Sequence, residues 1–128
     1  MAAYLIDTHL MLWWMTDDPL LGPATAARIA DADLDIAVSV LSLWELRLKE
    51  RRGKLRLPPV PLAETLVAQG IAVLPLKAEH VEAGRSIQLP HRDPFDHQLV
   101  AVAQAEQRIF LTRDHHILAA QLPHVQAA

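Results

Sequence analysis

Short apolar segments that alternate with helix-like segments restrict the fold of this chain more than any other feature. Segments of this length, with little polar alternation, are typical of strands buried on both faces of a sheet. Helices are predicted between them, which favours a parallel sheet covered on both sides. We therefore expect an α/β protein, a three-layer α/β/α sandwich around a mostly parallel sheet. The predicted strands are Ala3–Ile6, Leu34–Val38, Ile71–Leu74 and Arg108–Thr112, with a weaker fifth strand around His124 and Val125.

The helices between these strands are predicted from apolar periodicity, capping residues and punctuation by glycine and proline. Ser39 is a good N-cap for a helix that ends near Arg52, because Gly53 follows. Pro94 suits the first position of a helix reaching Gln107, since the missing N–H is not needed there. The other helices are expected over Leu10–Met15, Ala24–Ala32, Leu62–Gln69, Ala78–Ile87 and Ile117–Ala120.

The composition is that of a globular protein, and we expect residues 1–128 to form a single domain. Hydrophobic residues make up 52% of the 128 residues, which is enough for one core. The chain has no cysteine, which excludes disulfides and thiolate metal sites. No apolar run reaches membrane-spanning length, and the N-terminus lacks the basic start of a signal peptide. These features predict a cytoplasmic protein without a membrane partner.

The charge is unevenly distributed along the chain. A formal net charge of −3 argues against a protein that holds nucleic acid by a general positive field. One segment is nevertheless basic, and clusters of this kind are either solvated helix faces or contacts to phosphates. The RNA-binding candidates in this segment are Arg47, Lys49, Arg51, Arg52 and Lys54.

Two aspartates follow predicted strands directly. Asp7 comes after the first strand and Asp114 lies just beyond the fourth. Because the carboxyl ends of parallel strands meet at one edge of a sheet, where ligands bind in α/β proteins, we expect both side chains at that edge. The alternative for each residue is an N-cap without any chemical role.

Glu45 lies in the middle of a predicted helix, with leucines four residues before it and three residues after it. Such flanks place the carboxylate against a packed surface or a cleft. The alternative is an ion pair with Lys49 one turn later, which would stabilise the helix by only about 0.2–0.5 kcal/mol.

Two further carboxylates stand at the start of the helix that begins at Pro94. Asp93 fits the N-cap, and Asp96 lies one turn into the helix, where both could serve only to cap it and to complement its dipole. However, Asp96 is aligned with the apolar residues Leu99 and Val100. An unpaired charge in a packed interior is costly, so a cation should meet this carboxylate.

Together, these five carboxylates come from four separate segments and can reach one cleft. Gathered acids repel one another and raise one another's pKa values, a conflict that a divalent cation resolves. An all-oxygen ligand set suits Mg²⁺ or, alternatively, Mn²⁺. The chemistry most often built in this way is hydrolysis of phosphodiester bonds.

The chain resembles the PIN-domain ribonucleases and, within them, the VapC-like toxins of bacterial toxin–antitoxin pairs. The resemblance covers nearly the whole chain and rests on five ordered segments. These are Leu5–His9 with Leu12–Trp14, Ser42–Leu46, Gly53–Leu55, Leu89–Asp96 and Leu111–Asp114.

The resemblance implies a PIN-like fold and a set of roles for the acids. Asp7, Glu45, Asp96 and Asp114 would be the catalytic acids and metal ligands, with Asp93 as an accessory fifth ligand. Thr112 would be the hydroxyl that supports the site. His97 stands where many relatives have arginine, so the contact made by that side chain is not carried over.

The same resemblance implies a homodimer and a small antitoxin whose C-terminal segment blocks the acidic cleft. Trp13 and Trp14 follow Asp7 closely and either line this groove or pack in the core. The expected activity is Mg²⁺-dependent endonucleolytic cleavage of RNA that leaves 5′-phosphate and 3′-hydroxyl ends.

Three alternatives accompany this expectation. A non-catalytic PIN-like scaffold would keep the fold without the chemistry. A phospho-receiver module has similar architecture, but it requires a lysine after the fifth strand, and none occurs beyond Lys77. A zinc hydrolase is suggested by the histidine content, although the spacing matches no zinc motif. The seven histidines are His9, His80, His91, His97, His115, His116 and His124.

Overall fold

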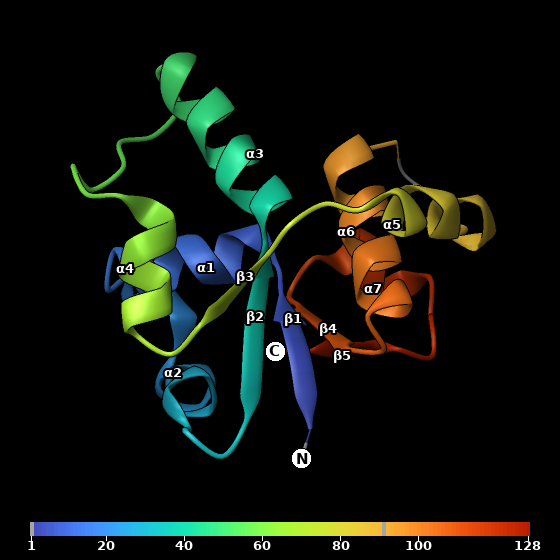
Figure 1. The fold of residues 1–128 in the computed structure, drawn as a ribbon, viewed down its shortest axis with the longest axis horizontal. Helices are drawn as coiled ribbons and strands as arrows, with labels where there is room; N and C mark the ends of the chain where they lie inside the picture. Colours follow the sequence, from blue (N-terminus) through green and yellow to red (C-terminus); the bar gives the residue numbers. More distant parts are fainter. Residues whose placement is uncertain (1, 91) are drawn as a thin grey trace.

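Five parallel strands form the centre of the structure (Figure 1). The computed structural model describes residues 2–90 and 92–128, so the predictions that involve His91 lie outside the described residues. The strand order is β3-β2-β1-β4-β5, and all four pairings are parallel. The bounds are β1 Ala3–Ile6, β2 Asp35–Ser39, β3 Ala72–Leu74, β4 Ile109–Thr112 and β5 Val125–Ala127.

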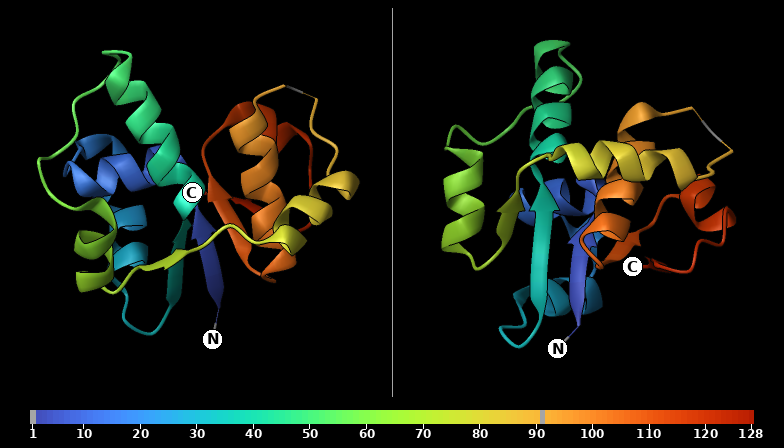
Figure 2. Two further views of the ribbon diagram at one scale, coloured as in Figure 1. Left: turned by 45° about the horizontal axis from the view of Figure 1, so that its top comes forward. Right: turned by 45° about the vertical axis from the view of Figure 1, so that its right-hand side comes forward.

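Helices cover both faces of this sheet, as Figures 1 and 2 show. One face carries α1 (Thr8–Met15), α2 (Pro23–Ala30) and α4 (Leu62–Ala68). The other face carries α5 (Ala78–Ala83), α6 (Pro94–Ala105) and α7 (His115–Ala119). Two short 3-10 helices, η1 (Pro19–Leu21) and η2 (Gly84–Ser86), join these elements. The helix α3 (Val40–Arg51) projects beyond the carboxyl ends of β1 and β2 (Figure 2).

Alternating side chains of the strands divide the core into two layers. Leu5 packs with the apolar residues of α6, whereas its neighbour Ile6 packs with Leu10 and Leu66 on the opposite face. All four of these side chains are at most 1% exposed. Each fully buried side chain of this type contributes about 2 kcal/mol through removal of apolar surface from water. The predicted three-layer sandwich is therefore confirmed, and so is the fifth strand.

One predicted helix is wrong in its length. The segment Ala78–Ile87 was expected to be a single helix, but α5 ends at Ala83 and a 3-10 turn follows over Gly84–Ser86. Ile87 is extended, and its carbonyl lies 3.1 Å from Nε2 of His97. The His97 ring also packs on Gly84, where an added Cβ would lie 3.3 Å from the ring carbon Cε1. Tertiary packing against α6 therefore ends the helix.

Other boundaries differ by one or two residues. The first helix begins at Thr8 rather than Leu10, because Asp7 caps it. The second strand is shifted by one residue to Asp35–Ser39, and the loop before α2 contains the turn η1. Among the described residues, no helix combines the length and the apolar character needed to cross a bilayer.

The strand order creates a crevice at one edge of the sheet. From β1 the chain proceeds to β2 and β3 on one side, and later to β4 and β5 on the other. The connections therefore change direction between β1 and β4, where α/β sheets bind ligands beyond the carboxyl ends of their strands. Ile6 pairs with Leu111 at this point, and the Asp7 N–H donates to the Leu111 carbonyl at 3.0 Å.

Candidate active site

Asp7 occupies the end of β1 and is almost completely buried, with 4% of its surface exposed. Its Oδ1 accepts the Thr8 N–H at 2.7 Å, which makes it the N-cap of α1. Its Oδ2 accepts the Thr112 hydroxyl at 2.6 Å. Burial raises the pKa of Asp7, while these two hydrogen bonds act in the opposite direction.

Thr112 ends β4 and joins two carboxylate-bearing segments. Its buried hydroxyl donates to Asp7 and accepts the N–H of Asp114 at 3.0 Å. Asp114 in turn caps α7, because its Oδ1 accepts the N–H groups of His116 and Ile117 at 2.8 and 3.2 Å. The Thr112 hydroxyl therefore contacts both strand-end aspartates, the side chain of Asp7 and the backbone N–H of Asp114.

Glu45 faces the same region from α3 and is 6% exposed. Its Oε1 accepts the Thr8 hydroxyl at 2.8 Å, and Thr8 is also 2.8 Å from the hydroxyl of Ser42. Its Oε2 lies 3.1 Å from Nζ of Lys49. The ion pair weighed as an alternative is therefore present, but a buried hydroxyl network accompanies it.

Thr8 and Ser42 are site residues that the sequence analysis did not single out. Both are buried, and together they hold the Glu45 carboxylate beside the end of β1. Two signals pointed to them. Thr8 follows a strand-end aspartate directly, and Ser42 precedes Glu45 by three residues, on the same face of α3.

The last two of the five predicted acids, Asp93 and Asp96, lie at the start of α6. Asp93 is the N-cap, since its Oδ1 accepts the N–H groups of Phe95 and Asp96 at 2.8 and 3.2 Å, and Pro94 begins the helix. The predicted capping arrangement is confirmed.

Asp96 is influenced electrostatically by the other four acids. Its pKa is raised to about 8, first by burial and then by four negative charges. Those charges belong to Asp7, Asp93, Asp114 and Glu45, in decreasing order of effect. The structure therefore places the other four predicted carboxylates near enough to Asp96 to influence its pKa, around the crevice between β1 and β4.

Two cavities are lined in part by members of this carboxylate cluster. The first, of about 240 Å³, is lined by Asp7, His9, Leu10, Trp13, Arg113 and Asp114. The second, of about 380 Å³, is lined by Glu45, Leu48, Lys49, Arg52 and the segment Asp93–Phe95. A larger cavity of about 610 Å³ lies between α1, η1 and α4, and none of the five carboxylates is among the described residues that line it. We assign the site to the carboxylate cluster rather than to this larger cavity, because all five predicted acids belong to the cluster and none of them lines the larger cavity.

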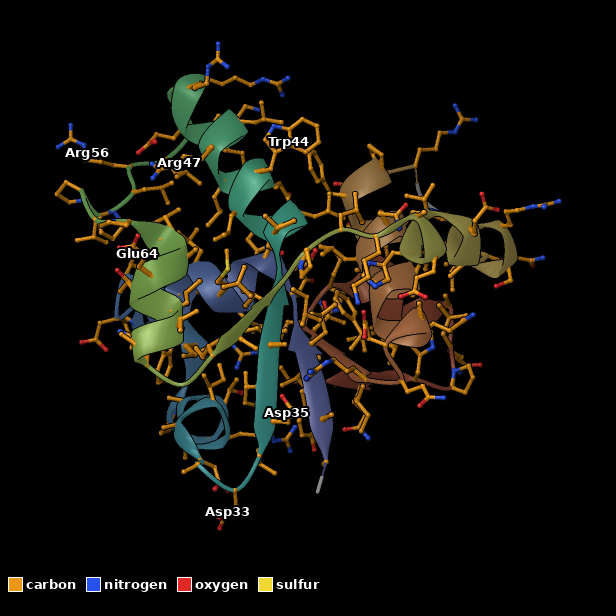
Figure 3. All side chains as sticks on the ribbon, viewed as in Figure 1. Asp33, Asp35, Trp44, Arg47, Arg56 and Glu64 are labelled. Atoms are coloured by element: carbon orange, nitrogen blue, oxygen red, sulfur yellow. The ribbon has the colours of Figure 1, made fainter. Side chains whose placement is uncertain are left out.

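The predicted basic residues divide into two groups. Lys49 and Arg52 line the second cavity beside Glu45. Arg47 is paired with Glu50 at 2.9 Å, and Figure 3 shows it on the side of α3 away from Trp44. Arg51 and Lys54 are exposed.

The two tryptophans after Asp7 differ in their contact with the acids. Trp13 lines both the first cavity, next to the acids, and the cavity of about 610 Å³. Trp14 lines the 610 Å³ cavity, and its indole N–H donates to Oε1 of Gln69 at 2.8 Å.

A second group of possible metal ligands lies away from this site. Among the described residues, Glu79, His80 and Glu106 bring three ligand atoms within 4.8 Å of one another. However, Nδ1 of His80 accepts the Lys77 N–H at 3.0 Å, and Nε2 lies 2.6 Å from Glu106. Nζ of Lys77 lies 3.8 Å from Glu106 and 3.9 Å from Glu79. Both ring nitrogens are thus occupied and a cation already lies between the acids, so this group joins α5 to α6.

The carboxylate cluster, in contrast, fits a hard divalent cation. Its candidate ligands are all carboxylate oxygen atoms, and burial together with the neighbouring acids raises the pKa of Asp96. A divalent cation there would offset the repulsion among these carboxylates.

The PIN domain family model matches residues 4–121 of this chain. The chain belongs to the PIN domain family. Two solved structures share the fold of this PIN protein. One is VapBC2 from Rickettsia felis bound to a DNA fragment from its promoter, with a TM-score of 0.65, 14% identity, and coverage of 98% of this chain and 97% of that chain. The other is a toxin–antitoxin complex from Klebsiella pneumoniae, with a TM-score of 0.59, 17% identity, and coverage of 97% and 96%. A search of curated protein sequences found no match.

Proposed function

We propose that this PIN protein is a metal-dependent endoribonuclease and the toxin of a toxin–antitoxin pair. The observation that carries the proposal is the position of Asp96 at the ligand-binding edge of the sheet, where burial and then four other carboxylates raise its pKa. A carboxylate cluster of this kind is disfavoured in a purely structural role, because like charges destabilise the folded state. Membership of the PIN family supports the assignment.

The five acids would be the ligands of Mg²⁺, or of Mn²⁺ in its place. Asp7, Asp96 and Asp114 would hold the first ion, while Glu45 and Asp93 would complete a second site or orient water. When bound, a divalent cation supplies activation of water for attack at phosphorus and stabilises charge on the leaving oxygen. Thr112 would keep Asp7 and Asp114 in place, since its hydroxyl contacts both.

The proposed substrate is RNA, cut to leave 5′-phosphate and 3′-hydroxyl ends because the 2′-hydroxyl takes no part in the attack. An acidic site that binds a polyanion needs local positive charge. Lys49 and Arg52 are placed to supply it, since they line the cavity beside Glu45 and Asp93. Arg47, Arg51 and Lys54 would contribute at longer range.

The proposed protein partner is suggested by the two similar structures. One is described as a toxin–antitoxin complex and the other as VapBC2 bound to promoter DNA, which supports an antitoxin that covers the acidic cleft. We also propose that the protein acts in the cytoplasm as a homodimer. It has exposed apolar side chains, among them Trp44 and Val81 at 57% and 52% exposure, which are consistent with a surface that binds another protein chain.

The decisive experiment is cleavage of total small RNA by the purified protein, with Mg²⁺, Mn²⁺ or chelator, followed by mapping of the product ends. Asp7→Asn and Asp96→Asn should abolish metal-dependent cuts that carry 5′-phosphate ends. Asp33→Asn is the matched control, because Asp33 lies at the opposite end of the sheet (Figure 3). Wild-type protein that binds metal but cuts no better than the two variants would favour the non-catalytic scaffold instead.

A further inference from the structure

We propose that the cavity beside Asp7 and Asp114 receives one unpaired nucleobase of the substrate, which stacks on Trp13, and that Arg113 is the positioning residue for that ring. The proposal rests on the proposed function and adds to it a binding site for one base of the RNA. It concerns the first cavity, whose described lining residues are all different from those of the cavity beside Lys49 and Arg52.

The cavity has the size and walls that a single base requires. Its volume is about 240 Å³, below the roughly 300 Å³ at which cavities begin to suit larger ligands. Trp13 supplies an aromatic wall, and the exposed His9 ring lies 6.0 Å from it at an angle of 44°. Because Asp7 and Asp114 line the same cavity, a base bound there belongs to a nucleotide next to the phosphate at the acids.

Arg113 is fixed by contacts from several segments of the chain. Its guanidinium donates to the carbonyls of Leu20 and Leu21, to the Thr25 hydroxyl at 3.0 Å and to the Ala128 carbonyl at 3.4 Å. Four of its five N–H donors are thereby directed at protein atoms. The side chain is therefore built into the wall and has little capacity left for a phosphate.

The same guanidinium lies over Trp13, with its central carbon 5.6 Å from the ring centroid. Arg113 thus covers one side of the indole and ties it to η1 and α2. A ring held in this way loses little conformational freedom when a base stacks on it. Stacking on an aromatic face tolerates any base but requires that the base be unpaired, since paired bases present only their edges.

The test is equilibrium binding of short dye-labelled oligouridylate and oligoadenylate, measured by fluorescence anisotropy in chelator on the Asp96→Asn background, which prevents cleavage. Replacement of Trp13 by leucine should weaken binding about tenfold or more, the ratio expected when one base–aromatic stack is lost. Trp13→Phe should retain most of the affinity, and it also serves as the variant with conserved packing. Trp14→Leu is the matched control, because both rings line the 610 Å³ cavity whereas Trp13 also lines the cavity beside the acids.

Oligonucleotides with a single abasic position locate the stacked base. At one position, removal of the base should weaken binding to the wild-type protein about as much as Trp13→Leu weakens binding of the intact oligonucleotide. The Trp13→Leu protein should bind the intact and the abasic oligonucleotide with equal affinity at that position. Equal affinity of the Trp13→Leu and wild-type proteins, additive losses at every position, or no binding of either oligonucleotide would each overturn the proposal.

Salt dependence separates the positioning role of Arg113 from a phosphate contact. Arg113→Gln removes the charge of this side chain; it should weaken binding, leave the slope of log affinity against log salt unchanged, and add no further loss to Trp13→Leu. A slope reduced by about one would mean that Arg113 contacts a phosphate, which overturns its positioning role.

The two proposals fail in different ways. RNA binding that depends on Trp13 without metal-dependent cleavage by the wild-type protein would refute the nuclease and leave the base site standing. If the wild-type protein cleaves RNA in a metal-dependent manner but Trp13→Leu binds RNA with the same affinity, only the base site is refuted.

Discussion

At the scale of single residues, Thr112 shows how one hydroxyl can organise a charged site. It donates to Asp7 and accepts from the backbone of Asp114, so it fixes two acids that belong to different segments. The threonine is fully buried, and water has little access to replace it. Its removal should therefore disturb the acids more than its distance from any substrate would suggest.

Replacement of Thr112 by valine should lower both stability and activity. The change keeps the shape of the side chain but leaves a buried carboxylate oxygen without its donor, at a cost of about 2 kcal/mol in the free energy of unfolding. Loss of a residue that orients ligands typically lowers metal affinity or activity by about 10- to 100-fold. Urea denaturation and RNA cleavage rates measure the two effects. Thr112→Ser retains the hydroxyl and should retain most of both, so equal losses in the two variants would contradict the assignment.

Asp96 predicts an unusual pH dependence of stability in the metal-free protein. Its pKa rises from 3.8 to about 8 on folding, so between these values the folded protein holds a proton that the unfolded chain has released. Stability should consequently fall as the pH rises through this range, and the raised pKa of Asp7 acts with the same sign. Thermal unfolding in chelator at pH 6 and pH 8 measures the slope. Asp96→Asn should flatten it, whereas Asp33→Asn should keep it.

At the scale of secondary-structure elements, α3 carries residues for both substrate binding and metal binding in the proposed function. Its inner face presents Glu45 to the acids, and Lys49 and Arg52 follow along the same cavity. On another face, the Trp44 ring meets Phe95 edge to face, with centroids 5.4 Å apart, which holds α3 against the start of α6. Figure 3 shows Arg56 beyond the end of this helix, on the side away from Trp44.

Charge reversal at Arg52 should weaken substrate binding without changing the chemistry. Arg52→Glu places a negative charge in the cavity that borders Glu45 and Asp93, so KM should rise several-fold and the effect should shrink at high salt. Arg56→Glu changes the net charge by the same amount at a distant position. Steady-state kinetics of both variants at two salt concentrations provide the measurement. If the two variants behave alike, the cavity has no special part in binding.

At the scale of the whole molecule, the sequence predicts the sheet, its helical layers and the edge at which the acids gather. Apolar strands and strand-end aspartates carry this information locally, as Asp7 and Asp114 illustrate. The hydrogen bond from Thr8 to Glu45 joins residues 37 positions apart, and no local pattern encodes such a contact. The same limit explains the shortened helix at Ala83, where packing against His97 outweighs helical periodicity.

Binding of Mg²⁺ should stabilise the whole fold, and the response identifies which acidic group holds the ion. A ligand that binds only the folded state adds about 2.7 kcal/mol at a concentration one hundred times its Kd. For a chain of this size the melting temperature should then rise by about 10 °C. Asp96→Asn should lose this rise. Glu79→Gln should keep it, because Glu79 belongs to the other group of clustered ligands, where Lys77 already lies 3.9 Å from its carboxylate. The measurement is differential scanning fluorimetry of the wild type, Asp96→Asn and Glu79→Gln across a series of Mg²⁺ concentrations. If only Glu79→Gln loses the rise in melting temperature, the ion binds at α5 and not at the strand ends.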